Sequence, residues 1–213
     1  MSLRTVLSAL ALVVGVGIVA SQVISEEPAK KEEPKPAASA GPEAMQQMMT
    51  EYAKWGAPGE QHKESAKAVG TWDVVCRIYM APDAPPMECK GSATFKTILG
   101  GRFLVQEYKG DMMGQPFEGM SIEGYDNFKK KYVSIWIDNM STGIWSSAGD
   151  CDPAGKNCTY YGSMDDPVTG VHDKMAKSVF RTIDNDKFTF DMYELFPDGT
   201  EKKCMAMEYT RRK

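Results

Sequence analysis

Signatures of the common enzyme classes are missing from this chain. The 213 residues contain no nucleophile elbow of the G-x-S-x-G type, no P-loop and no G-x-G-x-x-G dinucleotide-binding turn. The tripeptide Ser141-Thr142-Gly143 has no base near it in the sequence and is better explained as a turn. The sequence therefore predicts no cofactor, and it favours a protein that is not an enzyme.

Histidine is also scarce, which argues against metal and haem chemistry. Only His62 and His172 are present, in separate parts of the chain, and the cysteines show neither C-x-x-C nor Cys/His spacing. A single histidine could hold a haem, but nothing else supports that, and we interpret both as exposed residues. The 15 methionines suggest copper, yet they are scattered rather than repeated, so we interpret them as core filling and expect no metal.

Positive charge is too sparse for a nucleic-acid partner. The chain carries 25 Lys and Arg against 29 Asp and Glu, which gives a formal net charge of −4. Phosphate backbones are bound by basic faces. The one dense basic cluster of the folded part, Lys129–Lys131, falls in a predicted turn and is interpreted as a solvated loop tip.

The N-terminus predicts export. In residues 1–24, Arg4 precedes an uncharged run from Thr5 to Ala20, which is typical of a signal peptide or an uncleaved signal anchor. No cysteine precedes Cys76, which argues against a lipid-anchored lipoprotein. We therefore expect a periplasmic or secreted protein, tethered to the membrane only if this segment stays uncleaved.

Two further segments precede the predicted domain. Residues 25–42 are rich in Pro, Ala, Lys and Glu, a composition typical of a disordered linker. Residues 43–69 predict a short helical segment, because large apolar residues recur there at helical spacing. These residues are Met45, Met48, Met49, Tyr52 and Trp55.

Residues 70–213 alternate short strand-like runs with tight turns. The runs begin near residues 70, 87, 102, 116, 132, 143, 158, 174, 187 and 201, which makes about ten. Short loops between successive runs indicate local hairpins. The sequence thus predicts an all-β fold, a closed up-and-down antiparallel barrel, because closure removes the exposed edges that a sandwich would keep.

Particular motifs strengthen this assignment by resemblance. Gly70-Thr71-Trp72 resembles the G-x-W motif at the start of lipocalin-like (calycin) barrels. In those barrels a basic residue near the C-terminus packs over the Trp, and the resemblance implies that Arg211 or Arg212 has this role. From about Met45 onward the chain resembles a bacterial domain-of-unknown-function family. The motifs are LGGRFL (99–104), EYKG (107–110), PFEG (116–119), GYDN (124–127), KYVSIWID (131–138), STG (141–143), DPVTG (166–170) and YTRRK (209–213). The resemblance implies a calycin-like barrel and often export, and no established activity or ligand.

The five cysteines suit an oxidising compartment. Cys151 and Cys158 bracket a predicted turn, so we expect a disulfide between them. Cys76 and Cys89 flank a Pro-rich loop and give a second predicted disulfide. Pairing of Cys76 with Cys204 stays an alternative, since the first and last strands of a closed barrel are neighbours.

Period-2 alternation within the strands predicts a binding pocket. Large apolar residues share a strand face with an acid in three runs, and the other face of 132–138 is aliphatic. If the mixed faces point inward, they form one lumenal pocket. Its predicted residues are Trp136, Asp138, Glu107 and Glu194. The alternative places these acids outside a barrel filled by aliphatic residues.

Three functions follow from these features. The first is an exported protein that binds or carries a small, partly apolar ligand. The second is a lumenal enzyme in which an acid such as Glu107 or Glu194 transfers a proton. The third is a structural envelope protein whose barrel is fully packed and holds no ligand.

Export can be checked on the native protein. If the signal is cleaved, N-terminal sequencing should find a first residue between about Ser21 and Glu27. A cytoplasmic protein that begins at Met1 would contradict this prediction.

Overall fold

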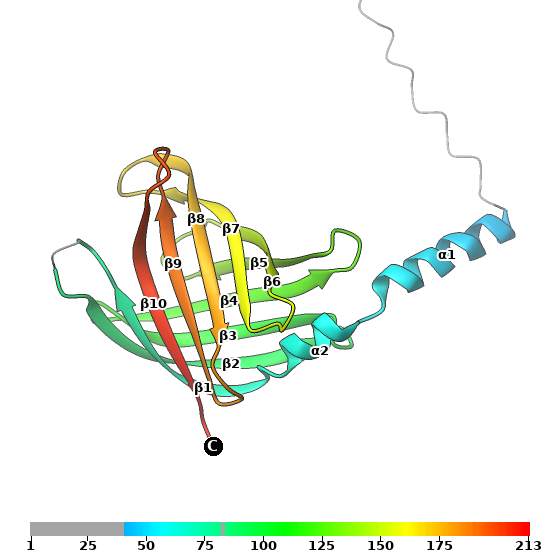
Figure 1. Ribbon diagram of the computed structural model, residues 1–213, viewed down its shortest axis with the longest axis horizontal. Coiled ribbons are helices and arrows are strands. Elements are labelled where there is room, and N and C mark those ends of the chain that lie inside the picture. Colours follow the sequence, from blue (N-terminus) through cyan, green and yellow to red (C-terminus); the bar gives the residue numbers. More distant parts are fainter. Residues whose placement is uncertain (1–40, 82–83) are drawn as a thin grey trace, which may run out of the picture. The chain divides into compact units, whose positions relative to one another are not determined.

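The computed structural model describes residues 41–81 and 84–213 (Figure 1). Two short helices come first, α1 (Pro42–Gly56) and α2 (Glu60–Ala66), within the segment that was expected to be helical. The predicted signal segment and almost all of the predicted linker lie outside the described residues. Of the helices in the described part, neither has the length and apolar character needed to cross a bilayer.

Ten antiparallel strands follow and close into a barrel. They are β1 (Gly70–Ile78), β2 (Met87–Ile98), β3 (Phe103–Met112), β4 (Gln115–Asp126), β5 (Lys131–Asp138), β6 (Trp145–Cys151), β7 (Asn157–Asp166), β8 (Val171–Thr182), β9 (Lys187–Leu195) and β10 (Glu201–Arg211). Each strand pairs with its neighbours in sequence, and β1 pairs with β10 from Trp72↔Arg211 to Ile78↔Met205. This confirms the predicted all-β, up-and-down, lipocalin-like architecture.

Turn chemistry explains why neighbouring strands pair. Between β3 and β4 the chain reverses at Met113 and Gly114, whose φ angles are 54° and 78°. Two successive residues with positive φ make the type of tight hairpin whose twist matches that of the strands. Because every connection joins strands that are neighbours in sequence, the first and last strands stay free to meet and close the barrel.

Register and burial together define the inward face of each strand. On β1 and β2 the inward pairs include Trp72↔Ala93 and Cys76↔Cys89, all buried. On β5 the inward residues are Tyr132, Ser134, Trp136 and Asp138. The aliphatic residues of β5 face outward, and Ile137 is 41% exposed. Small polar and aromatic side chains thus face the lumen on this strand.

One end of the barrel, here called the closed end, is covered by α2 and sealed by Trp72. The indole Nε1 donates to the Ala68 carbonyl at 2.8 Å, and the side chain is 2% exposed. The guanidinium of Arg211 lies 4.2 Å from the centre of the Trp72 ring. Its nitrogens also donate to the carbonyls of Val69 and Lys67 at 2.7 Å. Arg211 is therefore the basic residue that packs over the Trp, as the resemblance implies. Arg212 instead faces outward and forms an ion pair with Asp73.

The cysteines follow the hairpins. Cys151 and Cys158 face each other across β6 and β7 and form the expected disulfide. Cys76 and Cys89 also lie directly opposite each other, but both are free thiols, so the predicted bridge between them is not formed. The neighbour of Cys76 on β10 is Met207, which excludes direct pairing with Cys204 in this register.

The two C-terminal arginines offer a matched test of barrel closure. Arg211→Ala should lower the free energy of unfolding by about 2–3 kcal/mol, because it removes a cation–π contact and charged hydrogen bonds to three carbonyls. Arg212→Ala should cost much less, because it removes only a solvent-exposed ion pair. Urea unfolding of both variants measures this. Equal losses would contradict the sealing role of Arg211.

Candidate functional site

Buried and partly buried apolar side chains line the lumen. A buried cluster comes from β1–β4 and β10: Trp72, Val74, Ala93, Phe95, Leu104, Tyr108, Phe117 and Tyr209. The inward side chains of Trp136, Phe190 and Met207 pack against this cluster and stay only partly buried. Small eight-stranded barrels already hold one ligand, and ten strands enclose more.

A carboxyl group, that of Glu123, lies in the lumen near the closed end. Glu123 is inward on β4, between Leu104 and Ser134 in register. The Tyr160 hydroxyl donates to its Oε2 at 3.2 Å, and Ser65 of α2 donates to its Oε1 at 3.4 Å. Burial raises the pKa of Glu123, while these two hydrogen bonds lower it by less. The protonated form of Glu123 is therefore more favoured in this environment than it would be for a glutamic acid in water.

Two further polar groups face the same space. Ser178 lies opposite Tyr160 in register, is 2% exposed, and its hydroxyl has no hydrogen-bond partner among the described residues. Gln106 donates to the Tyr209 hydroxyl at 3.2 Å and accepts from Ser121 at 3.4 Å. Buried hydroxyls usually find a partner, so an unpaired one indicates a place where a ligand atom or water can bind.

Two of the residues predicted for the pocket, Trp136 and Asp138, lie together in the lumen. The Trp136 Nε1 donates to Asp138 Oδ2 at 2.9 Å, and its ring stacks on Phe117 with centroids 6.4 Å apart. The ring also lies across Gly119, where a Cβ would come within 2.2 Å of it. Glycine at 119 is therefore required for Trp136 to lie flat against the barrel wall.

Glu194 is also inward, near the end of the barrel opposite the closed end, but it lies on β9, which is not adjacent to β5. It pairs with Lys174 at 3.1 Å, and Lys174 also pairs with Asp166 at 3.1 Å. These three side chains form a local charge cluster, in which each carboxylate is compensated by the shared lysine. The hydrogen bonds and ion pairs of the described residues do not join Glu194 to Trp136 or Asp138.

Glu107 faces outward, which corrects its predicted place in the pocket. It forms an ion pair with Lys96 on the outer surface, and Lys96 holds its pKa below the usual value. The inward face of β3 carries Leu104, Gln106 and Tyr108, all of them buried. The prediction assumed that the strand face shared by Phe103, Val105 and Glu107 points inward. Phe103 is 37% exposed, so this face points outward.

Glu123 was missed, although one signal could have found it. The inward face of β4 carries Phe117, Gly119, Ser121 and Glu123. Because these residues are of mixed polarity, hydrophobicity alone does not distinguish the inward face of β4 from its outward face. The neighbouring strand β5 has a clearer alternation, and its register with β4 identifies the inward face of β4. Ser121 pairs with Trp136, and Glu123 pairs with Ser134, so an inward Trp136 implies an inward Glu123.

The two histidines stand in different surroundings. His62 is 8% exposed, which corrects the expectation that it lies at the surface. Its Nδ1 accepts the Gly59 amide at 3.0 Å at the start of α2, and burial lowers its pKa. His172 is exposed and lies beside Asp165. The described residues contain no cluster of three or more His, Cys, Asp or Glu side chains fit to hold a metal ion.

Comparison with known proteins places this barrel in a family. Residues 57–211 match the family described as "Protein of unknown function (DUF1579)". The chain belongs to the DUF1579 family. No curated protein matches it.

Solved structures resemble this DUF1579 protein in fold. The crystal structure of Rv2717c from M. tuberculosis matches with a TM-score of 0.53 and 13% identity, over 74% of this chain and 100% of that chain. A redesigned β-barrel matches with a TM-score of 0.37 and 14% identity, over 70% of this chain and 96% of that one. At such identities the first likeness shows the fold alone.

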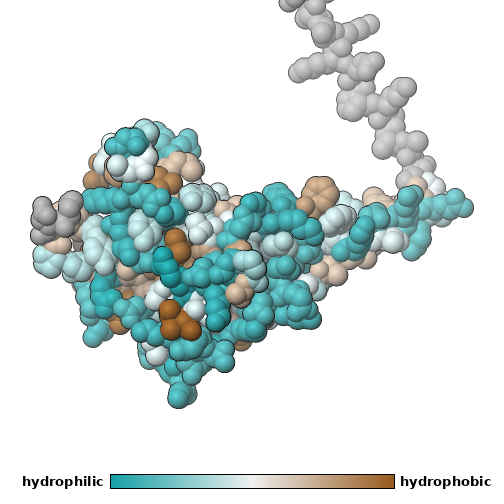
Figure 2. Space-filling view, viewed as in Figure 1, coloured by the Kyte–Doolittle hydropathy of each residue, from teal (hydrophilic) through white to brown (hydrophobic). Residues whose placement is uncertain are grey.

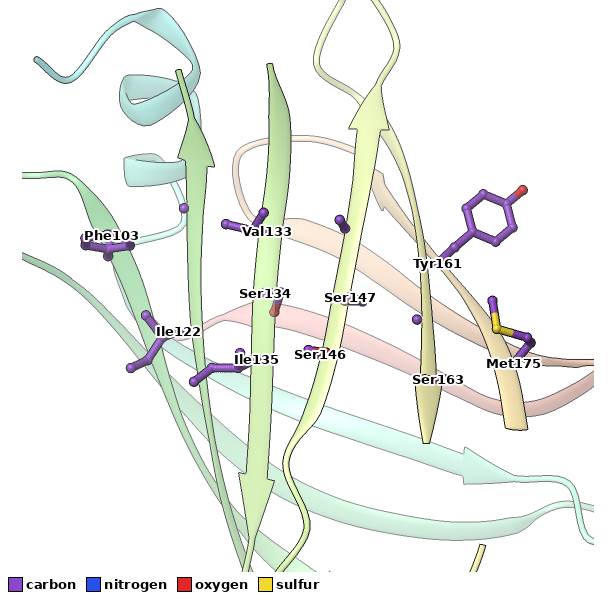
Figure 3. Close-up of a pocket in the computed structure, with 13 residues that line it drawn as sticks. Phe103, Ile122, Val133, Ser134, Ile135, Ser146, Ser147, Tyr161, Ser163 and Met175 are labelled. Carbon is purple, nitrogen blue, oxygen red and sulfur yellow. The ribbon is translucent and has the colours of Figure 1, made fainter. Parts of the chain in front are cut away.

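A second concave region of the DUF1579 barrel lies outside the lumen, over β3–β8. It measures about 600 Å³. Figure 3 shows Phe103, Ile122, Val133 and Ile135 on one side of it and Tyr161 and Met175 on the other. Serines line the part between these walls. Elsewhere, the face drawn in Figure 2 is mostly hydrophilic, with scattered hydrophobic residues. The hollow is open to solvent and contains no charged side chain, so it offers less chemistry than the lumen.

The environment of Glu123 predicts a distinctive pH dependence. Its folded pKa is raised, so ionisation opposes folding, and stability should fall as pH rises above the unfolded pKa of about 4.3. The free energy of unfolding of wild type minus that of Glu123→Gln should therefore decrease with pH, by at most about 1.4 kcal/mol per unit.

Glu107→Gln is the matched control for that experiment. The folded pKa of Glu107 is lowered, so its contribution to stability is present above the unfolded pKa and lost in acid. The corresponding difference should rise slightly with pH. Chemical unfolding of the three proteins between pH 4 and 8 decides the matter, and a flat or rising curve for Glu123→Gln would show that Glu123 is not desolvated.

Proposed function

We propose that this protein binds a small, partly apolar molecule in the lumen of its barrel, outside the cytoplasm. The observation that carries the proposal is the unpaired Ser178 hydroxyl, buried in the lumen opposite Tyr160, whose own hydroxyl contacts Glu123. A barrel that only needed packing would not bury a polar group without a partner, because an unsatisfied hydroxyl costs about 1–3 kcal/mol.

The lining indicates the chemistry of the ligand. Partly buried aromatic and thioether side chains, such as Phe190, Trp136 and Met207, suit an apolar body. A protonated Glu123 donates a hydrogen bond, and Ser178 can donate or accept one. A ligand with a carbonyl or hydroxyl at one end would satisfy both groups. Such a combination of apolar walls and few convergent polar groups is usual for small-molecule sites.

A second candidate function is acid–base catalysis by Glu123. An acid with a raised pKa inside a cavity is a common feature of active sites, and Tyr160 would hold its carboxyl in place. In this function Glu123 would have the catalytic role that the sequence suggested for Glu107 or Glu194. Conversion of a bound compound that stops in Glu123→Gln, with binding retained, would favour it over a carrier.

Export is part of the proposal and is supported by the N-terminal sequence. The charged and then apolar residues 1–24 and the Pro-rich residues 25–42 are typical of a secreted or membrane-tethered protein. The Cys151–Cys158 disulfide is consistent with an oxidising compartment. A periplasmic or secreted binding protein would meet its ligand there.

Native mass spectrometry tests lumenal binding. Protein purified from its own host should retain a small molecule, whose mass identifies its class. Ser178→Ala and Glu123→Gln should each weaken binding of that molecule about tenfold, because each removes one hydrogen bond in a buried site. Both substitutions preserve the size of the side chain closely, so the barrel should remain folded.

Met175→Ser is the control for this experiment, because Met175 lines the outer hollow and faces away from the lumen. It should leave binding unchanged. Loss of the ligand in Met175→Ser, with full binding in the lumenal variants, would move the site to the outer hollow. A native protein with no bound molecule, in which Ser178→Ala is as stable as wild type, would favour the structural alternative.

A further inference from the structure

Three sulfur-containing residues meet on the inward face of neighbouring strands. Cys76 on β1 pairs with Cys89 on β2 at one edge and with Met207 on β10 at the other. Both thiols are unbonded, and the two cysteines are 2% and 8% exposed. This trio, here called the sulfur row, contains neither Glu123 nor Ser178, but it shares Met207 with the apolar lining of the proposed ligand site.

The neighbours of the sulfur row hold its side chains in place. The Tyr108 side chain lies across β2, and a Cβ at Gly91 would come within 2.4 Å of its hydroxyl oxygen. Glycine at 91 thus lets Tyr108 cover the lumen beside the two cysteines. On the other side the Tyr209 hydroxyl donates to the Met207 Sδ at 3.6 Å, which orients the thioether.

The reactivity of the thiols argues against redox catalysis. Burial raises the pKa of Cys76 to about 12, with Cys89 adding to the shift. Cysteines that attack disulfides have lowered pKa values, since the thiolate is the nucleophile. Two buried thiols with a thioether beside them are instead a set of soft sulfur ligands, in which a bound metal ion would replace the two thiol protons.

We propose that Cys76, Cys89 and Met207 bind one Cu(I) ion. Thiolates and thioethers are the ligands that Cu(I) prefers, whereas hard cations prefer oxygen. Residues directly opposite on antiparallel strands have Cβ atoms about 4.5–5.5 Å apart, so both Sγ atoms can turn toward one ion between them. Each thiol loses its proton on binding, so one Cu(I) releases two protons and forms a complex with a net charge of −1.

The sulfur row lies close to one end of the barrel. Only one inward pair, Ile78↔Met87, separates Cys76 and Cys89 from the ends of β1 and β2 opposite the closed end. Met205 lies beside Ile78 on β10 and adds a thioether near this end. An ion that enters from that end would meet soft ligands first.

Copper titration of the reduced full chain tests the proposal. The protein is reduced without oxygen, the reductant is removed, and Cu(I) is offered in competition with a chromogenic Cu(I) chelator. Wild type should take one Cu(I) per chain and show a thiolate-to-copper absorption band in the ultraviolet. Cys76→Ser and Cys89→Ser should lose more affinity than the 10–100-fold that outer-shell changes cost. Met207→Leu should weaken binding about tenfold.

Cys204→Ser is the matched control, because Cys204 is the third free thiol and instead donates to the Met192 carbonyl. It should bind Cu(I) as wild type does. X-ray absorption of loaded wild type should show a first shell of sulfur only, a result that does not depend on whether a variant folds. Wild-type affinity in Cys76→Ser, a nitrogen or oxygen first shell, or no uptake by protein with both thiols verified as reduced would each overturn the proposal.

Discussion

Pairing of the first strand with the last is the constraint on which the rest of this structure depends. It runs from Trp72↔Arg211 to Ile78↔Met205 and turns an open meander into a tube with an inside. Arg211 locks the end of this pairing, because one guanidinium covers the Trp72 ring and binds the carbonyls that lead from α2 into β1. Without closure, the inward and outward faces would both be exposed sheet surfaces, and the polar groups of the lumen would simply be solvated.

Within the closed barrel, Gly91 and Gly119 determine how two aromatic side chains pack against the wall. The rings of Tyr108 and Trp136 do not point at the centre of the lumen; they lie along the wall, over Gly91 and Gly119, where any Cβ would collide with them. A ring laid flat in this way covers the backbone of its neighbours. This arrangement explains why several inward side chains remain partly accessible even though the barrel has a buried aromatic cluster.

The fold was predictable because it is local. Tight turns with Gly and Asp set each hairpin, and the G-x-W opening and basic C-terminus resemble a known barrel type. The register of Cys151 with Cys158 and of Cys76 with Cys89 followed from the same hairpins. The site was less predictable. On β3 both faces carry apolar residues, so hydrophobic contrast could not decide between Glu107 and Gln106 as the inward residue.

Two of the acids that face the lumen, Glu123 and Glu194, differ in the groups that compensate them, and this difference makes the two ends of the lumen chemically distinct. Glu194 stands near the open strand ends with Lys174, so its charge is balanced by a cation in a partly solvated place. Glu123 stands under α2 with hydroxyl partners only, so the acid is stabilised in its neutral form. A ligand in the site that we propose would therefore leave a charged rim, pass aromatic and sulfur side chains, and meet hydroxyl groups and an acid of raised pKa at the closed end. Such a gradient disfavours an ion at the closed end, because a charge there would lose its hydration without an opposite charge to replace it. The polar end of the bound molecule is therefore expected to be uncharged and to lie toward α2.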